Sequence, residues 1–109
     1  MGYGLLVGKP LSHWLASQGA TITVVNEFTA DPARFTTQAD LIVCATGQTN
    51  ILSVAMVNPE TVVIDFGREV EFTSVSEKVA LITPPLGGIG PIVIASAFAN
   101  LVTLKENRN

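Results

Sequence analysis

Four short apolar runs, separated by segments with helical character, restrict this chain to a small set of folds. The runs are residues 21–25, 41–45, 61–65 and 79–82. They are apolar without strict alternation, which is typical of strands in a parallel sheet covered by helices on both faces. The intervening segments predict the order α-β-α-β-α-β-α-β-α. This order indicates an open, doubly wound α/β domain.

The helices expected between the runs have recognisable ends. Residues 7–18 carry apolar side chains at helical spacing and stop at Gly19, a common C-terminal signal. Residues 31–38 begin with Asp31 as the cap and Pro32 in the first turn. The other expected helical segments are 51–56, 72–78 and 91–105.

The expected sheet is incomplete at its beginning. A doubly wound domain normally opens with a strand, whereas here residues 1–4 lead directly into the first helix. At most the first few residues could form the end of that strand, so we expect it to be shortened or missing. The 109 residues suffice for one core. We therefore predict a single three-layer Rossmann-type domain over residues 1–109, with a mostly parallel sheet.

A glycine-rich loop lies between the last apolar run and the last helix. Gly87, Gly88 and Gly90 have no Cβ, so their backbone allows strained dihedrals and close approach of a ligand. Pro91 suits the first turn of a helix. A plain turn before a helix is the simpler interpretation, and three glycines between prolines favour a ligand loop. The apolar helix 91–105 should pack against the sheet.

A second glycine cluster opens the chain. Gly2, Gly4 and Gly8 resemble a dinucleotide fingerprint, in which glycines allow a tight turn and close approach to a pyrophosphate. The helix that follows would offer free N–H groups to the anion. The third glycine is one residue late, so a glycine-rich terminus without this role is the alternative.

An acidic residue follows the first apolar run. Glu27 lies about twenty residues after the glycine cluster, where an acidic side chain accepts hydrogen bonds from a ribose 2′-hydroxyl. A carboxylate there repels a 2′-phosphate, so NAD would be preferred over NADP. The alternative is a solvated loop glutamate.

Two further segments end at the carboxyl edge of the predicted sheet, where ligands bind in such folds. They are 45–48 and 65–68. Gly47 and Gly67 could allow close packing of a nicotinamide ribose. Asp65 could instead cap the following loop.

Composition excludes several other classes of site. The net charge is −3 and the lysines and arginines are scattered, which argues against nucleic acid as a partner. The single cysteine, Cys44, is expected to be a buried small hydrophobe, so neither a disulfide nor a cysteine-based metal site is expected. His13 is expected to be a surface or packing residue. No metal site is expected.

Membrane and export signals are also not expected. We find no signal peptide and no apolar run near the ~18 residues of a membrane span. A cytoplasmic protein without a membrane partner is the resulting expectation. The high apolar fraction, 48%, predicts that a partner covers part of the surface, and we expect a homodimer.

Taken in order, the segments resemble the C-terminal NAD(P)-binding domain of the bifunctional methylenetetrahydrofolate dehydrogenase/cyclohydrolase family. The resemblance covers almost the whole chain, and its most specific part is the Gly-Gly-Ile-Gly-Pro sequence. The matching segments are 2–11, 39–43, 45–48, 62–67, 82–84 and 87–91.

The resemblance implies hydride transfer from 5,10-methylenetetrahydrofolate to NAD(P), followed by hydrolysis of the methenyl product. It assigns the catalytic lysine and its partner tyrosine to an N-terminal folate-binding domain that nothing here matches, so this chain would carry no catalytic residue and be inactive alone. The implied cofactor-binding residues are Gly2, Tyr3, Gly4, Gly8, Glu27, Phe28, Ala45, Thr46, Gly47, Phe66, Arg68 and Val93. The implied substrate-binding residues are Gly87, Gly88, Ile89, Gly90 and Pro91.

The chain departs from the family pattern at several places. Tyr3 replaces an arginine, and Glu27-Phe28 replaces a Ser-Arg pair, which removes a cationic phosphate clamp. Leu86 and Val93 replace a proline and a threonine, and the segment after Gly67 is shorter than usual. Two functions therefore stay open: part of a dehydrogenase/cyclohydrolase, or a non-catalytic dinucleotide-binding or dimerisation module.

Overall fold

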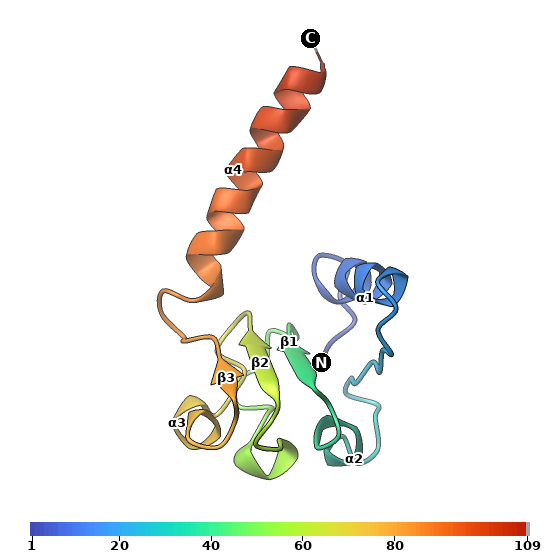
Figure 1. Cartoon of the computed structure of the whole chain (residues 1–109), viewed down its shortest axis with the longest axis vertical. Coiled ribbons are helices and arrows are strands. Elements are labelled where there is room, and N and C mark those ends of the chain that lie inside the picture. Colours follow the sequence, from blue (N-terminus) through green and yellow to red (C-terminus); the bar gives the residue numbers. More distant parts are fainter. Residues whose placement is uncertain (109) are drawn as a thin grey trace.

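The computed structural model describes residues 1–108 and is shown in Figure 1. Its elements alternate between helices and strands. In chain order they are α1 (Gly8–Ser17), α2 (Ala33–Thr36), β1 (Leu41–Cys44), the 3₁₀ turn η1 (Val54–Met56), β2 (Val62–Asp65), α3 (Phe72–Ser76), β3 (Leu81–Ile82) and α4 (Ile89–Asn107).

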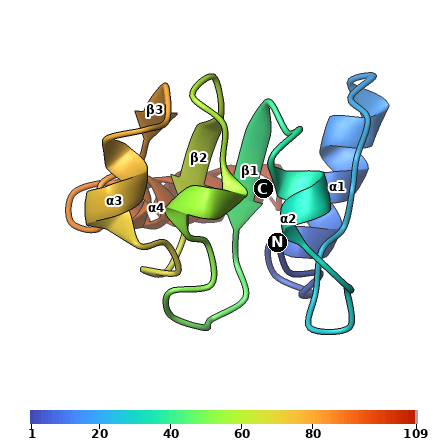
Figure 2. The ribbon, with the colours of Figure 1, turned by 90° about the horizontal axis from the view of Figure 1, so that it is seen from below.

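The three strands form one parallel sheet in the order β1-β2-β3. Leu41 pairs with Val62 in β2, and Val62 pairs in turn with Leu81 in β3. Figure 2, seen from below, shows α2 and α3 in front of the strands and α4 behind them. The predicted α/β class and parallel sheet are therefore confirmed.

The core lies on the face of the sheet that α2, η1 and α3 cover. Ile42 and Cys44 of β1 and Val63 of β2 point into it. They pack with four buried residues from the connecting segments, Leu52, Val57, Val70 and Val75. The alternate residues of the same strands face the other side and are only partly buried. Much of the second face is therefore open.

The sequence predicted a strand at residues 21–25, and this prediction is wrong. The segment is not paired as a strand, and its contact with the sheet edge is the bond from Gly2 N–H to the Val25 carbonyl, at 2.8 Å. Met1 is bonded to the end of β1: its amino group donates to the Val43 carbonyl, and Ala45 N–H donates to the Met1 carbonyl at 3.1 Å. A strand needs hydrogen-bond partners along its whole length to join a sheet. Met1 and Gly2 offer partners only at the end of residues 21–25, so this segment stays outside the sheet.

Several expected helices are shorter than the sequence suggested. Asp31 has φ +49° and makes no capping bond, so α2 begins after Pro32 instead. The expected helix at 51–56 shrinks to η1, because Leu52 is extended and pairs with Val70 in an isolated bridge. Local propensity is overridden here by tertiary pairing.

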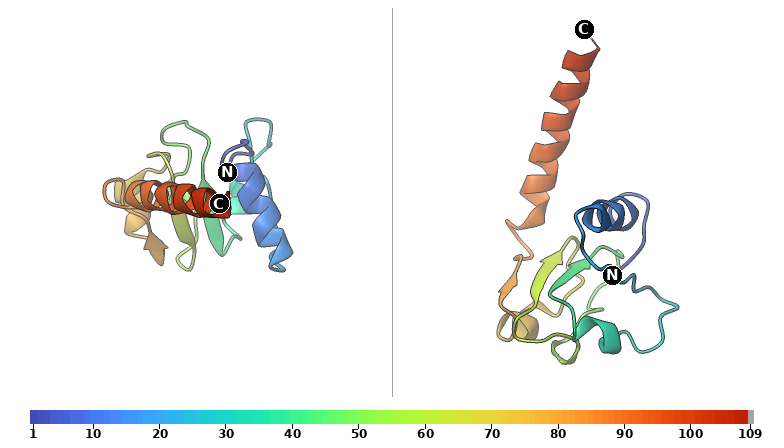
Figure 3. Two further views of the ribbon diagram at one scale, coloured as in Figure 1. Left: turned by 90° about the horizontal axis from the view of Figure 1, so that it is seen from above. Right: turned by 45° about the vertical axis from the view of Figure 1, so that its right-hand side comes forward.

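Helix α4 does not pack on the sheet, so that expectation is wrong. It has no buried residue, and the right-hand view of Figure 3 shows it extending away from the strands. The Cα radius of gyration is 15.1 Å, against about 13 Å for a compact chain of this size. Apolar residues surround the helix on all sides, with Ile92, Phe98 and Leu101 each more than 60% exposed. Such a helix has no single stripe to direct packing.

The same helix also overturns the expectation that no apolar run approaches the length of a membrane span. Helix α4 has 19 residues and contains an 18-residue window of mean hydropathy 1.3, none of it buried. By length and composition alone it could cross a membrane. The same properties suit a helix that another protein covers.

Candidate functional site

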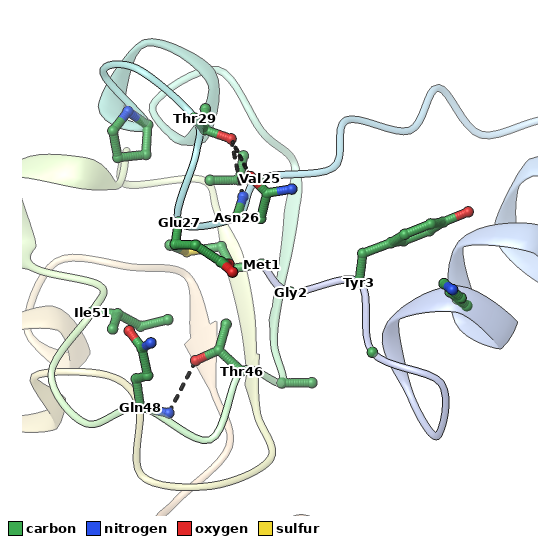
Figure 4. Close-up of a pocket in the computed structure, with 14 residues that line it drawn as sticks. Met1, Gly2, Tyr3, Val25, Asn26, Glu27, Thr29, Thr46, Gln48 and Ile51 are labelled. Atoms are coloured by element: carbon green, nitrogen blue, oxygen red, sulfur yellow. Dashed lines mark hydrogen bonds between the residues drawn. The ribbon is translucent and has the colours of Figure 1, made fainter.

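A cleft of about 760 Å³ opens at the carboxyl end of β1. Its volume lies in the range of roughly 300–1,000 Å³ that is typical of ligand sites. Residues from the segments 1–4, 25–32 and 45–51 form it, together with Lys9 at the start of α1 (Figure 4). The lining residues are Met1, Gly2, Tyr3, Gly4, Lys9, Val25, Asn26, Glu27, Thr29, Pro32, Ala45, Thr46, Gln48 and Ile51.

Gly2 is the point at which the segments meet. It has φ +91°, and a Cβ placed on it would lie 2.7 Å from the Ala45 carbonyl oxygen and 3.0 Å from Thr46 Cγ2. Any larger residue would push the first segment away from the end of β1. The structure therefore places the opening glycine segment at the carboxyl rim of the sheet, as its sequence predicted.

Gly8 packs beneath the same segment rather than lining the cleft. A Cβ there would lie 2.5 Å from the Gly2 carbonyl oxygen and 2.8 Å from Tyr3 Cα. The helix start offers fewer free donors than the sequence suggested, because Lys9 N–H already donates to the Gly4 carbonyl at 2.9 Å and Pro10 has none. An anion in the cleft would rely on the Lys9 side chain, which lines it and lies 5.5 Å from the centre of the Tyr3 ring.

A tight turn presents Glu27 to the cleft. Asn26 N–H donates to Thr29 Oγ1 and Phe28 N–H donates to Asn26 Oδ1, both at 3.0 Å. These bonds fix residues 26–29 and leave the Glu27 carboxylate at the rim, across from Thr46 and Gln48 in Figure 4. Phe28 is 86% exposed and does not line the cleft.

The predicted residues separate into two groups. The cleft brings together Gly2, Tyr3, Gly4, Glu27, Ala45 and Thr46. The structure leaves the other implied cofactor residues outside its lining: Gly8, Phe28, Gly47, Phe66, Arg68 and Val93. Val93 lies on the projecting helix α4, which explains its distance from β1. Within residues 1–108, no three histidine, cysteine or acidic side chains converge as a metal site.

The implied substrate loop, 87–91, follows β3 at the far end of the sheet from the cleft. It is tightly folded: Gly87 has φ +73°, and a Cβ on Gly88 would lie 2.3 Å from the Pro84 carbonyl oxygen. The sequence therefore located a loop that needs glycine at these positions. That this segment binds the folate substrate stays a prediction.

Sequence reasoning assigned no individual binding role to several lining residues, among them Lys9, Asn26, Thr29, Gln48 and Ile51, although Gln48 lies in the segment 45–48 predicted at the carboxyl edge. The Asn-x-x-Thr spacing of Asn26 and Thr29 is typical of a side-chain-stabilised turn and could have been found. Glu69 was also missed. It is buried, and its side chain accepts hydrogen bonds from Thr46 and Gly47.

Asp65 caps the loop that follows β2, which was the alternative to a ligand role. Its Oδ1 accepts from the N–H groups of Gly67 and Glu69 at 3.0 Å, and its Oδ2 accepts from Val70 N–H at 3.2 Å. The aspartate therefore organises the loop that carries Glu69.

Cys44 is fully buried below the cleft, as expected from the sequence, and His13 is exposed on α1. Burial is the main cause that raises the pKa of the Cys44 thiol to about 12; Glu69 and Asp65 raise it further, and the Met1 amino group opposes them. The thiol is therefore neutral and inert in the folded chain at pH 8.

A pH series tests the state of Cys44. Above pH 9.0 the unfolded thiol loses a proton that the folded one keeps up to about pH 12, so stability falls as pH rises. The expected slope approaches about 1.4 kcal/mol per pH unit from this group. Urea unfolding of the wild type and Cys44→Ala between pH 8 and 10.5 measures it, and only the wild type should show this slope. Equal slopes in the wild type and in Cys44→Ala would contradict the raised pKa of the Cys44 thiol.

The fold and cleft together define a class of protein. A parallel α/β sheet has a cofactor-sized cleft at its carboxyl edge, closed on one side by glycines and on the other by an acidic residue after the first apolar run. These are the features of a dinucleotide-binding domain.

Comparison with known proteins gives the particular family. Residues 1–109 match the sequence profile of the tetrahydrofolate dehydrogenase/cyclohydrolase NAD(P)-binding domain. The bifunctional protein FolD of Variovorax paradoxus is 40% identical over 97% of this chain and 41% of its own length; that of Ralstonia pickettii is 40% identical over 97% and 40%. The chain belongs to this family and spans about 40% of the length of these relatives.

Solved structures agree. A FolD methylenetetrahydrofolate dehydrogenase/cyclohydrolase from Campylobacter jejuni is 37% identical, with a TM-score of 0.93 over 99% of this chain and 42% of that one. A 5,10-methylenetetrahydrofolate dehydrogenase from the silkworm Bombyx mori is 28% identical, with a TM-score of 0.88 over 98% and 42%. Because α4 is 19 residues long, coverage of 99% includes it, so the projecting helix is matched there.

Proposed function

We propose that this chain holds NAD(P) in the cleft beside β1, as the dinucleotide-binding part of a 5,10-methylenetetrahydrofolate dehydrogenase/methenyltetrahydrofolate cyclohydrolase in one-carbon metabolism. The family match over residues 1–109 and the names of the relatives support this assignment. The observation that carries it is Gly2, whose missing side chain lets the opening glycine segment pack against the carboxyl end of β1, where a dinucleotide would lie.

The residues present fit such a cofactor. The cleft has a suitable volume, Lys9 supplies a cation near the start of α1, and Glu27 supplies an acceptor for ribose hydroxyls. A bound NAD(P) would supply the hydride acceptor for the folate's methylene carbon. The chain's own contribution is to bind and orient the dinucleotide.

Folate binding and the acid/base lysine belong, on this proposal, to protein that packs against the apolar helix α4 and the open face of the sheet. Both surfaces are exposed, and the chain covers only 42% of the Campylobacter jejuni structure. We extend the proposal to a cytoplasmic homodimer in which protein, rather than lipid, covers α4. Neither nucleic acid nor a membrane is a partner in this proposal.

The preference for NAD over NADP follows from Glu27. Its carboxylate lies at the rim of the cleft and would repel a 2′-phosphate, while the cation that lines the cleft, Lys9, lies at the start of α1. The family profile itself names both cofactors.

Titration with each dinucleotide tests function and preference together. A dinucleotide at 100 times its dissociation constant should stabilise the wild type by about 2.7 kcal/mol, with NAD the tighter ligand. Glu27→Arg should move the ratio of the two dissociation constants at least tenfold towards NADP, about 1.4 kcal/mol. Glu60→Arg, an exposed glutamate outside the cleft, is the matched control and should leave the ratio unchanged.

The same titration separates the second candidate function. The exposed apolar surface of α4 favours a non-catalytic dinucleotide-binding or dimerisation module. If neither NAD nor NADP stabilises the chain, the dimerisation module gains support and cofactor binding is contradicted.

A further inference from the structure

Glu69 is the most deeply buried acidic residue among residues 1–108, and its side chain joins two loops. It is 1% exposed. It belongs to the loop after β2, yet its oxygens reach the turn after β1. Its Oε1 accepts from Thr46 N–H at 2.7 Å and from Gly47 N–H at 2.8 Å. Its Oε2 accepts from the Thr46 hydroxyl at 2.8 Å and from Thr46 N–H at 2.9 Å.

The backbone of Glu69 is equally constrained. Its N–H donates to Asp65 Oδ1 at 3.0 Å, so the end of β2 fixes its position. Its carbonyl accepts from Ile51 N–H at 2.6 Å and from Leu52 N–H at 3.3 Å. The side chain therefore holds the beginning of the loop 45–51, and the main chain holds its end.

These bonds decide which groups of the turn can face a ligand. The N–H groups of Thr46 and Gly47 are both occupied by Glu69. The Thr46 hydroxyl donates to Glu69 and accepts from Gln48 N–H at 3.1 Å. With its N–H and hydroxyl engaged, Thr46 has its carbonyl oxygen left as a polar group for a ligand. The backbone of the turn can therefore accept hydrogen bonds from hydroxyl or amide donors, whereas its Thr46 and Gly47 N–H groups are not available to an anion.

We propose that Glu69 is the positioning residue of the cofactor turn: it fixes residues 45–48 so that they present acceptors to the hydroxyl-bearing part of the dinucleotide. This proposal rests on the proposed function for its ligand. The phosphates then lie on the other side of the cleft, towards Lys9. A buried carboxyl group needs hydrogen-bond partners for its oxygens, and Thr46 and Gly47 supply them.

Amide hydrogen exchange of the wild-type chain tests the geometry without any substitution or ligand. Thr46 and Gly47 are exposed residues, so in an unrestrained turn their amides would exchange at open-chain rates. Because both donate to a buried carboxylate, they should exchange at least a hundredfold more slowly than Thr49 in the same loop. Equal rates at these three amides would overturn the proposal.

Glu69→Gln tests the consequence for binding. Glutamine keeps the shape of the side chain and replaces one acceptor with an NH₂ group that faces N–H donors. At a temperature where the variant is folded, we expect NAD to bind at least tenfold more weakly and the Thr46 and Gly47 amide resonances to shift upfield. Unchanged affinity together with unchanged resonances would contradict the role.

Thr61→Val separates positioning from a merely structural role. Thr61 is fully buried, and its hydroxyl donates to the Ala39 carbonyl at 3.0 Å, near the start of β2 and away from the cleft. This variant should lose stability and keep its affinity for NAD. An equal loss of affinity in both variants would assign Glu69 only a structural role. If the wild type binds no dinucleotide, the proposed function fails, whereas the exchange and resonance measurements still decide whether Glu69 fixes the turn.

Discussion

Gly8→Ala is expected to destabilise the chain by about 1–3 kcal/mol, the usual cost of inserting a methyl group into a packed site. Local propensity predicts the opposite sign, because alanine favours a helix over glycine by about 1 kcal/mol. The added Cβ, however, would lie 2.5 Å from the Gly2 carbonyl oxygen and 2.8 Å from Tyr3 Cα. Both are backbone neighbours and cannot rotate away.

The strain should also reach the cleft. Gly2 N–H donates to the Val25 carbonyl on one side, and the Met1 carbonyl accepts from Ala45 N–H on the other. Moving the Gly2 carbonyl therefore shifts the segment that closes the cleft, and we expect NAD to bind at least tenfold more weakly. Urea unfolding and a dinucleotide titration measure the two effects.

Gly4→Ala is the matched control for Gly8→Ala. Gly4 lies in the same segment, and a Cβ there meets no atom within 4 Å. Its unfolding free energy should stay within about 0.5 kcal/mol of the wild type, as for ordinary surface substitutions. A Gly8→Ala chain that was as stable as the wild type would show that Gly8 does not support the opening segment.

The second large effect is expected at Gly88, where the last loop turns into α4. A Cβ at this position would lie 2.3 Å from the Pro84 carbonyl oxygen, so Pro84 or the start of the helix must move. The neighbouring Thr83 donates to the Val63 carbonyl and accepts from Asp65 N–H. The displacement should therefore loosen the end of β2 and destabilise the chain by about 1–3 kcal/mol.

Gly90→Ala serves as the comparison. Gly90 lies two residues further on, inside α4, and a Cβ there meets nothing within 4 Å. This variant should be as stable as the wild type or gain up to about 1 kcal/mol from better helix propensity. Thermal unfolding of both variants, with amide exchange at Asp65 as the local probe, gives the result. Similar behaviour of the two variants would contradict the close contact with Pro84.

The sequence predicted the parts of the site that depend on local backbone chemistry. Glycines mark positions where the chain must approach another segment, which is why Gly2 and Gly88 could be singled out. Glu27 was predicted from its spacing after the glycine cluster, and it lies in the cleft. Spacing alone could not show that Phe66 and Arg68, at the end of β2, lie outside the cleft lining.

Glu69 shows what the sequence could not reveal. It reads as a charged residue in a short loop, a type that is usually exposed. Its burial depends on Asp65, which folds the loop so that the Glu69 side chain turns inward towards Thr46. Two loops that are more than twenty residues apart in sequence must meet before this residue acquires a role.

The amino-acid order by itself determined the α/β class, the direction of the strands and the places that require glycine, because these depend on periodicity and on backbone freedom. Only the tertiary structure decided whether residues 21–25 enter the sheet, where α4 lies and which N–H groups remain available to a ligand. Each of these depends on a hydrogen-bonding or packing partner from a distant part of the chain. A local sequence pattern does not show whether such a partner is present.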